Sequence, residues 1–270
     1  MKTTRSGLAL FAIATLAGAT LAVAPALATP TPNGAEIRTR IFNDCPTSVV
    51  TTVNSYPAQI IIDDAQVDCP LGFANRHAWS FSEDGGVTSA AFANFSAWKI
   101  SAIFTLSGAT QGEGGLRISP WFSQYVDGTI MCRTNDGEIS VFGGRLPFYN
   151  FTAAYGIHYV KGTSIYLEAL YIPNGLSMAS PATIEYRIVY GGSFYSSGPL
   201  AFDEGNPAED PPYGLWGILN DARVGGWVQV ILPHADGGQL RAEWGDIKFE
   251  NLDRVDAEAT SWGRLKGLYR

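Results

Sequence analysis

The chain has 270 residues and a net charge of −7, and only 16% of its residues are charged. No basic stripe is present that could neutralise phosphates, which argues against a nucleic-acid partner. Aromatic residues make up 12% of the chain and there are 30 glycines. This combination is typical of short, well-buried strands joined by tight turns.

Residues 1–28 have the pattern of a cleavable signal peptide. Lys2 and Arg5 precede an apolar run from Leu8 to Val23, and Ala26-Leu27-Ala28 offers the small residues that signal peptidase reads. The alternative is a membrane anchor, but the run is short for a span of about 20 residues and is rich in alanine. We therefore expect a secreted, extracellular protein, with the periplasm or the cell surface as other destinations. The alanine-rich leader is typical of bacteria.

The rest of the chain is long enough for one large β domain. We expect a Thr/Pro-rich linker over residues 29–36, a single domain over residues 37–253 and a C-terminal tail over residues 254–270. No segment after the leader is apolar and long enough to cross a bilayer. A short helical turn in the tail would carry one apolar stripe, formed by Trp262, Leu265, Leu268 and Tyr269. This stripe fits either docking on the domain or contact with a partner or sorting machinery.

Three cysteines follow the leader. Cys45 and Cys69 each precede a proline in loop-like sequence, and with an export signal in place we expect a disulfide between them. Cys132 alternates with Ile130 in a strand pattern and is interpreted as a buried free thiol. No close Cys/His spacing points to a structural metal site.

Strand-like stretches run through the domain and are separated by turn signals. Thr134-Asn135-Asp136-Gly137 predicts a hairpin, and Pro173-Asn174-Gly175 and Gly191-Gly192 predict further turns. Arg145 to Tyr155 is interpreted as a loop. Two strands are expected within residues 43–67. The other expected strands, in chain order, are Ile37–Phe42, Ala78–Phe81, Trp98–Leu106, Leu116–Ile118, Thr129–Arg133, Glu138–Phe142, Ile157–Val160, Thr163–Ile172, Ile184–Tyr190, Ser193–Leu200, Leu215–Leu219, Gly226–Leu232 and Gln239–Phe249.

The pattern predicts an all-β fold: an antiparallel, two-sheet jelly-roll sandwich of about a dozen strands with a short C-terminal tail. Along residues 184–190, Ile184, Tyr186, Ile188 and Tyr190 face one way and Glu185, Arg187 and Val189 the other, as in a strand with one buried face. Thr163–Ile172 has apolar side chains on both faces, which favours a strand in the middle of a two-layer stack. No amphipathic helix is predicted inside the domain.

These strands resemble the concanavalin A-like lectin/glucanase superfamily, which includes laminin-G-like domains. The resemblance covers roughly Ile37 to Leu252 and rests on EGGLRISPWF, DGEISVFGG, YVKGTSIYLEALYIP and EWGDIKFENL. It implies a curved sheet whose concave face and rim loops often bind glycans, frequently with a bound calcium; a fold alone does not imply catalysis.

Members that resemble laminarinases carry an E-x-D-x-E strand, which would place its carboxylates in the cleft for a retaining mechanism. That pattern is absent from the chain. Asp246 and Glu250 share a face if their strand is regular, whereas Glu243 and Asp246 do not. The chain also lacks a G-x-S-x-G elbow and an H-E-x-x-H motif. We therefore lean away from an enzyme.

Glycan recognition uses aromatic rings that stack on sugar faces and polar side chains that bond the hydroxyls. The ligand-binding candidates are Trp121, Tyr125, Arg133, Arg145, Tyr149, Trp216, Trp227 and Gln229. The alternative for each aromatic is a place in the core between two sheets. A calcium site on an oxygen-rich loop is a second hypothesis, and a solvated acidic loop is the alternative. Its candidate ligands are Asp203, Glu204, Asn206, Glu209 and Asp210.

The preferred hypothesis is a secreted, non-catalytic, lectin-like domain that recognises an extracellular glycan. A structural or adhesive cell-surface protein is the first alternative, and a polysaccharide-active glycoside hydrolase is the second. An exposed Trp or Tyr along a groove would favour the first hypothesis. Two carboxylates about 5–9 Å apart in that groove would favour the last.

Overall fold

The structure is a computed structural model that describes residues 29–69, 75–119, 128–203, 216–219, 221–231 and 234–253. It contains two antiparallel sheets of seven strands each. Sheet A has the strand order β1 (Gly34–Phe42), β4 (Arg76–Ser82), β13 (Arg223–Val230), β6 (Gly112–Ser119), β7 (Thr129–Arg133), β8 (Ile139–Phe142) and β9 (Tyr149–Asn150). Sheet B has the order β12 (Ser193–Ala201), β11 (Thr183–Tyr190), β10 (Ser164–Ile172), β5 (Trp98–Ser107), β14 (His234–Asn251), β3 (Gln59–Cys69) and β2 (Val49–Ser55).

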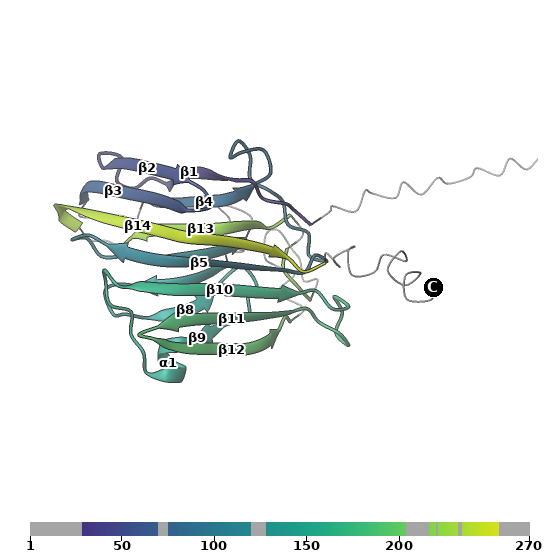
Figure 1. The fold of residues 1–270 in the computed structure, drawn as a ribbon. Coiled ribbons are helices and arrows are strands. Elements are labelled where there is room, and N and C mark those ends of the chain that lie inside the picture. The colour runs from purple at the N-terminus through teal and green to yellow at the C-terminus, as the bar shows by residue number, and fades with distance from the viewer. Residues whose placement is uncertain are drawn as a thin grey trace, which may run out of the picture.

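The two sheets lie face to face, with β1 and β2 at one edge and β9 and β12 at the other (Figure 1). The antiparallel two-sheet sandwich implied by the resemblance to concanavalin A-like proteins is confirmed. Among the residues that the structure describes, no helix is long and apolar enough to cross a membrane.

The core between the sheets is built from alternate residues of each strand. On β10, Ile165, Leu167 and Ala169 are buried against it. The other face of this strand is only half-buried, so the prediction that both faces are buried is wrong for Tyr166 and Leu170. The sequence pattern of Thr163–Ile172 is ambiguous. Apolar side chains on both faces occur in a strand that is buried on both sides, and also in a central strand of a sheet with one open face.

Three tryptophans fill the middle of this core. Trp79, Trp98 and Trp244 are each no more than 1% exposed, and Nε1 of Trp244 donates to the carbonyl of Gly115 at 2.9 Å. Gly226 on β13 lies against two of these rings: a Cβ atom there would lie 2.3 Å from Nε1 of Trp79 and 2.6 Å from Nε1 of Trp244. Only glycine leaves room for both indoles.

Within the described ranges, one short helix interrupts the β structure. Helix α1 (Phe151–Tyr155) begins at Asn150, whose side chain accepts a hydrogen bond from the backbone of Ala153, and ends at Gly156 with φ 67°. The expectation of a loop here is therefore wrong, because Asn and Gly are the favoured residues at helix starts and ends. The predicted strand Ile157–Val160 is wrong, because these residues form no strand. The predicted strand Leu215–Leu219 is also wrong for residues 216–219, of which 216–218 form a bend.

The disulfide between Cys45 and Cys69 is present, with 5.7 Å between the two Cα atoms. Asn75 lies beside it and donates to the carbonyl of Cys45 and to Asp64 Oδ2, both at 3.0 Å. His77 accepts the backbone N–H of Arg40 at its Nδ1 atom, so its Nε2 atom carries the proton that faces Asp64 Oδ2 at 3.2 Å. Cys132 is buried and free, and burial raises the pKa of its thiol.

The N-terminal residues of the described chain bind along the domain. Strand β1 begins at Gly34, so the last part of the expected linker is strand. Thr31 donates its backbone N–H to Glu83 at 2.7 Å, and the Thr29 hydroxyl donates to the carboxylate of Asp253 at 2.7 Å. Thr29 and Asp253 therefore lie next to each other.

Candidate functional site

The face of sheet A that points away from sheet B carries an aligned set of polar side chains. Gln229 on β13 lies directly opposite Arg76 on β4 and Glu113 on β6, and Glu113 lies opposite Arg133 on β7. The backbone N–H of Arg133 donates to the carbonyl of Glu138 at 2.9 Å, which makes Glu138 the next position, immediately before β8. We call these five residues the polar row.

Alternation along each strand places the polar row on this outer face of sheet A. The chain neighbours of its members pack into the core instead; these are Val228, Val230, Cys132 and Ile139. Gln229, Glu113, Arg133 and Glu138 are partly exposed, whereas Arg76 is buried at 8% exposure. One end of the polar row is thus open to solvent.

Arg133 is held by two carboxylates. Its Nε atom lies 3.0 Å from Oδ1 of Asp136 and its Nη2 atom lies 2.6 Å from Oδ2, and Nη2 also contacts Glu138. The hydrogen bond from Arg133 lowers the pKa of Asp136. Glu138 accepts a second bond, 2.8 Å, from the amide of Asn150. These contacts fix the position of the guanidinium through its Nε and Nη2 atoms.

Glu113 lies between two arginines of the polar row. Burial raises the pKa of its carboxyl, and the charges of Arg133 and Arg76 offset only part of this effect. A carboxyl whose pKa is higher in the folded than in the unfolded protein binds its proton more tightly when folded. Its charge therefore lowers stability as the pH rises through that pKa.

Replacing Glu113 with glutamine should remove this penalty. We expect Glu113→Gln to raise the melting temperature at pH 7 by about 2 °C and to leave it nearly unchanged at pH 4, where the wild-type carboxyl is largely protonated. Calorimetric scans at the two pH values measure the difference. An equal shift at both would contradict the raised pKa as the cause.

Arg76 packs on an aromatic ring next to the polar row. Its guanidinium carbon lies 4.5 Å from the centre of the Trp227 ring, close enough for a cation–π contact. Trp227 is 1% exposed and packs with Ala78 and Met131. Met131 lies two strands from Trp227, and it reaches the indole because the residue between them, Gly115, has no side chain.

A third arginine lies further along the same face. Arg117 on β6 alternates with core residues Leu116 and Ile118, and its Nη2 atom donates to the hydroxyl of Ser80 at 2.6 Å. Gly225 lies between the two strands that carry Arg117 and Ser80. The outer face of sheet A therefore carries three arginines, Arg76, Arg117 and Arg133, which are matched by the carboxylates of Glu113, Asp136 and Glu138.

Comparisons with known proteins find solved structures only. No family model matches the chain, and no curated protein matches it. An alginate lyase of polysaccharide lyase family 7 has 11% identity and a TM-score of 0.39, over 73% of this chain and 80% of its own. Lectin II from Ulex europaeus has 8% identity and a TM-score of 0.41, over 82% of this chain and 95% of its own. A protein of unknown function from Saccharomyces cerevisiae has 8% identity and a TM-score of 0.41, over 76% and 97%.

These identities and scores carry no argument about function. The fold assignment rests on the order and pairing of the chain's own strands.

The structure brings three of the predicted ligand-binding residues together: Arg133, Gln229 and Trp227. The expectation of Trp227 as an exposed ring is wrong, because the residue is buried under Arg76. Tyr149 lies in β9 with its ring 4.8 Å from Phe151. Burial, together with the hydrogen bond that its hydroxyl donates to Tyr155, raises its pKa to about 12. It is a packing residue at the edge of the sandwich.

The remaining candidates lie elsewhere. The carbonyl of Trp216 accepts a hydrogen bond from Ala182, which precedes β11 of sheet B. Arg145 pairs with Asp203 at the ends of β8 and β12. Trp121 and Tyr125 lie outside the described residues, as do four of the five predicted calcium ligands: Glu204, Asn206, Glu209 and Asp210. Among the residues that are described, no three acidic, His or Cys side chains group around a metal position, and calcium stays a prediction.

Sequence reasoning missed three members of the polar row, Arg76, Glu113 and Glu138, and also Arg117. A signal for two of them was present, since Glu113 and Arg117 have the parity opposite to Leu116 and Ile118 and so must point out of the core. The sequence does not indicate that Arg76 points out of the core, because the residues before it contain no strand pattern.

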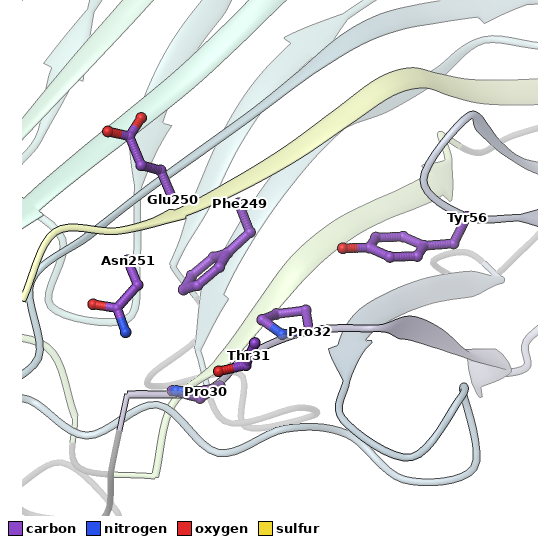
Figure 2. Close-up of a pocket in the computed structure, with 7 residues that line it drawn as sticks. All are labelled: Pro30, Thr31, Pro32, Tyr56, Phe249, Glu250 and Asn251. Carbon is purple, nitrogen blue, oxygen red and sulfur yellow. The ribbon is translucent and has the colours of Figure 1, made fainter. Parts of the chain in front are cut away.

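A separate cavity of about 440 Å³ lies at the other end of the sandwich. Figure 2 shows the rings of Tyr56 and Phe249 on either side of Pro32, with Pro30, Thr31, Glu250 and Asn251 completing the wall. Burial raises the pKa of Tyr56. The segment through Pro32 leads to Gly34, which pairs with Ser82, whereas the polar row begins at Arg76 at the opposite end of β4. The cavity and the polar row are distinct.

Proposed function

We propose that this protein is a secreted, non-catalytic, lectin-like domain that binds an extracellular carbohydrate along the polar row. The observation that carries the proposal is the alignment of Arg76, Gln229, Glu113, Arg133 and Glu138 at directly opposed positions of neighbouring strands. Neighbouring strands are about 4.8 Å apart, so the five positions span about 19 Å. That length suits an extended chain of several sugar rings.

The chemistry of the polar row matches sugar hydroxyls. Each hydroxyl both donates and accepts a hydrogen bond, and the row offers guanidinium donors, carboxylate acceptors and an amide that does both. Because the side chains are fixed by a sheet and by ion pairs such as that between Arg133 and Asp136, little side-chain freedom is lost on binding. The predicted leader supports an extracellular location for this ligand.

The alternatives of a hydrolase and of a structural protein lack a specific observation in their favour. Glu113 and Glu138 flank Arg133 at a strand separation of about 10 Å, and Glu138 is engaged by Arg133 and Asn150. A hydrolase needs an acid and a second free carboxylate at a defined separation. Release of reducing ends distinguishes the hydrolase in the same experiment.

The test is binding of the protein from Thr29 to Arg270 to a panel of soluble and insoluble polysaccharides, with and without calcium. For a polysaccharide that binds, we expect Gln229→Ala and Arg133→Ala each to weaken the affinity about 10- to 100-fold, the range for a lost hydrogen bond to a charged or buried group. Isothermal titration calorimetry with a soluble fragment measures the change.

Arg187 provides a matched control on sheet B. Like Arg133 it is paired with two carboxylates, Glu168 at 3.0 Å and Glu185 at 2.7 Å, but it points out of the opposite face of the sandwich. Arg187→Ala should leave the affinity unchanged. Equal loss in Arg133→Ala and Arg187→Ala, or no retention on any polysaccharide, would overturn the proposal.

A further inference from the structure

Arg145 lies in the loop after β8, and its side chain is only 1% exposed. Its Nη2 atom donates to the carbonyl and to Oδ1 of Asp203, at 3.3 and 3.2 Å. Its Nε and Nη1 atoms are buried and have no hydrogen-bond partner among the residues that the structure describes. A guanidinium stays charged in a protein, so burying two of its donors without acceptors is unfavourable.

Asp203 compensates little of this charge. Its side chain is 86% exposed, and an ion pair with an exposed carboxylate is weakened by solvent. The contact also uses only one of the three nitrogen atoms of the guanidinium. Most of the hydrogen-bonding capacity of Arg145 is left for another group.

The backbone of Arg145 is unfavourable as well. Its φ is 67°, after Gly143 at 75° and Gly144 at 54°. Glycine adopts such angles without strain, but a residue with a side chain does so at a cost. An arginine at this position therefore lowers the stability of the free protein through both its backbone and its side chain, which points to a contact with a ligand.

A second unsatisfied donor lies next to this loop. Leu146 packs against Gly128, where a Cβ atom would lie 2.6 Å from Cγ of Leu146. The next residue, Thr129, is 2% exposed, and its hydroxyl has no hydrogen-bond partner within the described parts of the chain. Thr129 alternates with core residue Ile130 and so faces outward on β7, on the same face as Arg133.

We infer that Arg145 and Thr129 form a subsite for an anionic group, and that the saccharide bound along the polar row is an acidic one. This inference rests on the proposed function and names its ligand class. The polar row does not select an anion, because Asp136 and Glu138 balance Arg133. Arg145, whose one partner carboxylate is exposed, supplies the positive charge that a carboxylate or a sulfate ester recognises.

The geometry limits the ligand further. Thr129 and Arg133 lie four residues apart on β7, about 14 Å, so a ligand that reaches both is an oligosaccharide of at least two rings. The net charge of −7 disfavours a long polyanion lying over the whole surface. A saccharide with one acidic group at the subsite and neighbouring hydroxyls on the polar row would span the distance from Thr129 to Arg133. It would also limit repulsion from the net negative charge of the chain.

The experiment compares a galacturonic acid trimer with its methyl ester, which has the same rings and no charge, and with a sulfated galactan oligosaccharide. For the full chain from Thr29, we expect at least one of the two acidic probes to bind about 10-fold or more tightly than the ester, the worth of one charge-assisted contact. Arg145→Gln should abolish that difference and leave the affinity for the ester unchanged. Asp203→Asn, which removes the competing carboxylate, should keep the difference or increase it.

The outcomes separate the two proposals. If the ester binds and Gln229→Ala weakens it, while neither acidic probe binds more tightly, the acidic ligand class is wrong and the carbohydrate site stands. If Arg145→Gln weakens all probes equally, the residue is structural and the inference is overturned. If no probe binds, neutral or acidic, while another polysaccharide of the panel is retained, the inference is overturned and the carbohydrate site stands; without retention of any polysaccharide, both are overturned.

A stability measurement tests the same residue without a ligand. Arg145→Gly relieves the positive φ and removes the buried charge, so we expect its melting temperature to rise by about 2 °C. A lower melting temperature would show that Arg145 stabilises the free fold and would overturn its role as a ligand contact.

Discussion

Replacing Trp244 with alanine is expected to lower the free energy of unfolding by about 4 kcal/mol, near the upper end of large-to-small changes in a core. Trp244 is fully buried, and its ring lies 5.4 Å from Phe104 and 6.1 Å from Trp79, between the centroids. The change empties the centre of the sandwich and also leaves the carbonyl of Gly115 without the indole donor. Chemical denaturation followed by near-ultraviolet circular dichroism measures the loss.

Two further variants identify the cause. Trp244→Phe keeps an aromatic ring but not the donor, so a loss smaller than that of Trp244→Ala would separate the cavity from the hydrogen bond. Val87→Ala changes a residue that is 74% exposed and should shift stability by less than about 0.5 kcal/mol. A loss below about 1 kcal/mol in Trp244→Ala would show that the two sheets do not pack around this ring.

Removing the disulfide by the double change Cys45→Ser and Cys69→Ser should lower the free energy of unfolding by about 3 kcal/mol. The bond closes a loop with a sequence separation of 24 residues, and opening it lets the unfolded chain gain entropy. The buried hydrogen bonds of Asn75 to Cys45 and Asp64 then depend on packing alone.

The measurement is urea unfolding of the wild type and of the double variant, each with and without a thiol reductant. The reductant should lower the stability of the wild type to that of the double variant and have no effect on the variant, whose remaining cysteine, Cys132, is buried. An effect of similar size in both proteins would show that the bond is not the source of the stability.

Much of this fold could be read from strand periodicity. Ile184–Tyr190 alternates strictly, and each of its core residues lies where the alternation places it. Short capping signals were harder to recognise: Asn150 and Gly156 bound a five-residue helix that has no apolar periodicity of its own. The Trp216 segment was mistaken for a strand because apolar residues there pack into the core from a bend, and composition alone does not distinguish the two.

The site could be predicted only in part. Alternation with Val228 and Val230 places Gln229 on the same face as Trp227, because alternation determines the face of a sheet on which a side chain lies. Alternation does not determine whether that face is open, and so the burial of Trp227 was missed. The register that brings Gln229 opposite both Arg76 and Glu113 depends on pairing between strands far apart in sequence, which no local pattern encodes.

The hydrogen bond between Thr29 and Asp253 holds the two ends of the sandwich side by side. A unit whose ends meet can be spliced into a surface loop of an unrelated host, because the host chain has to open by only a few ångströms to receive it. Grafted in this way, residues 29–253 would fold as an insert and present the outer face of sheet A from the host surface. Because the inserted domain would be joined to the host at both ends, it would carry the polar row into an enzyme or scaffold without a flexible linker.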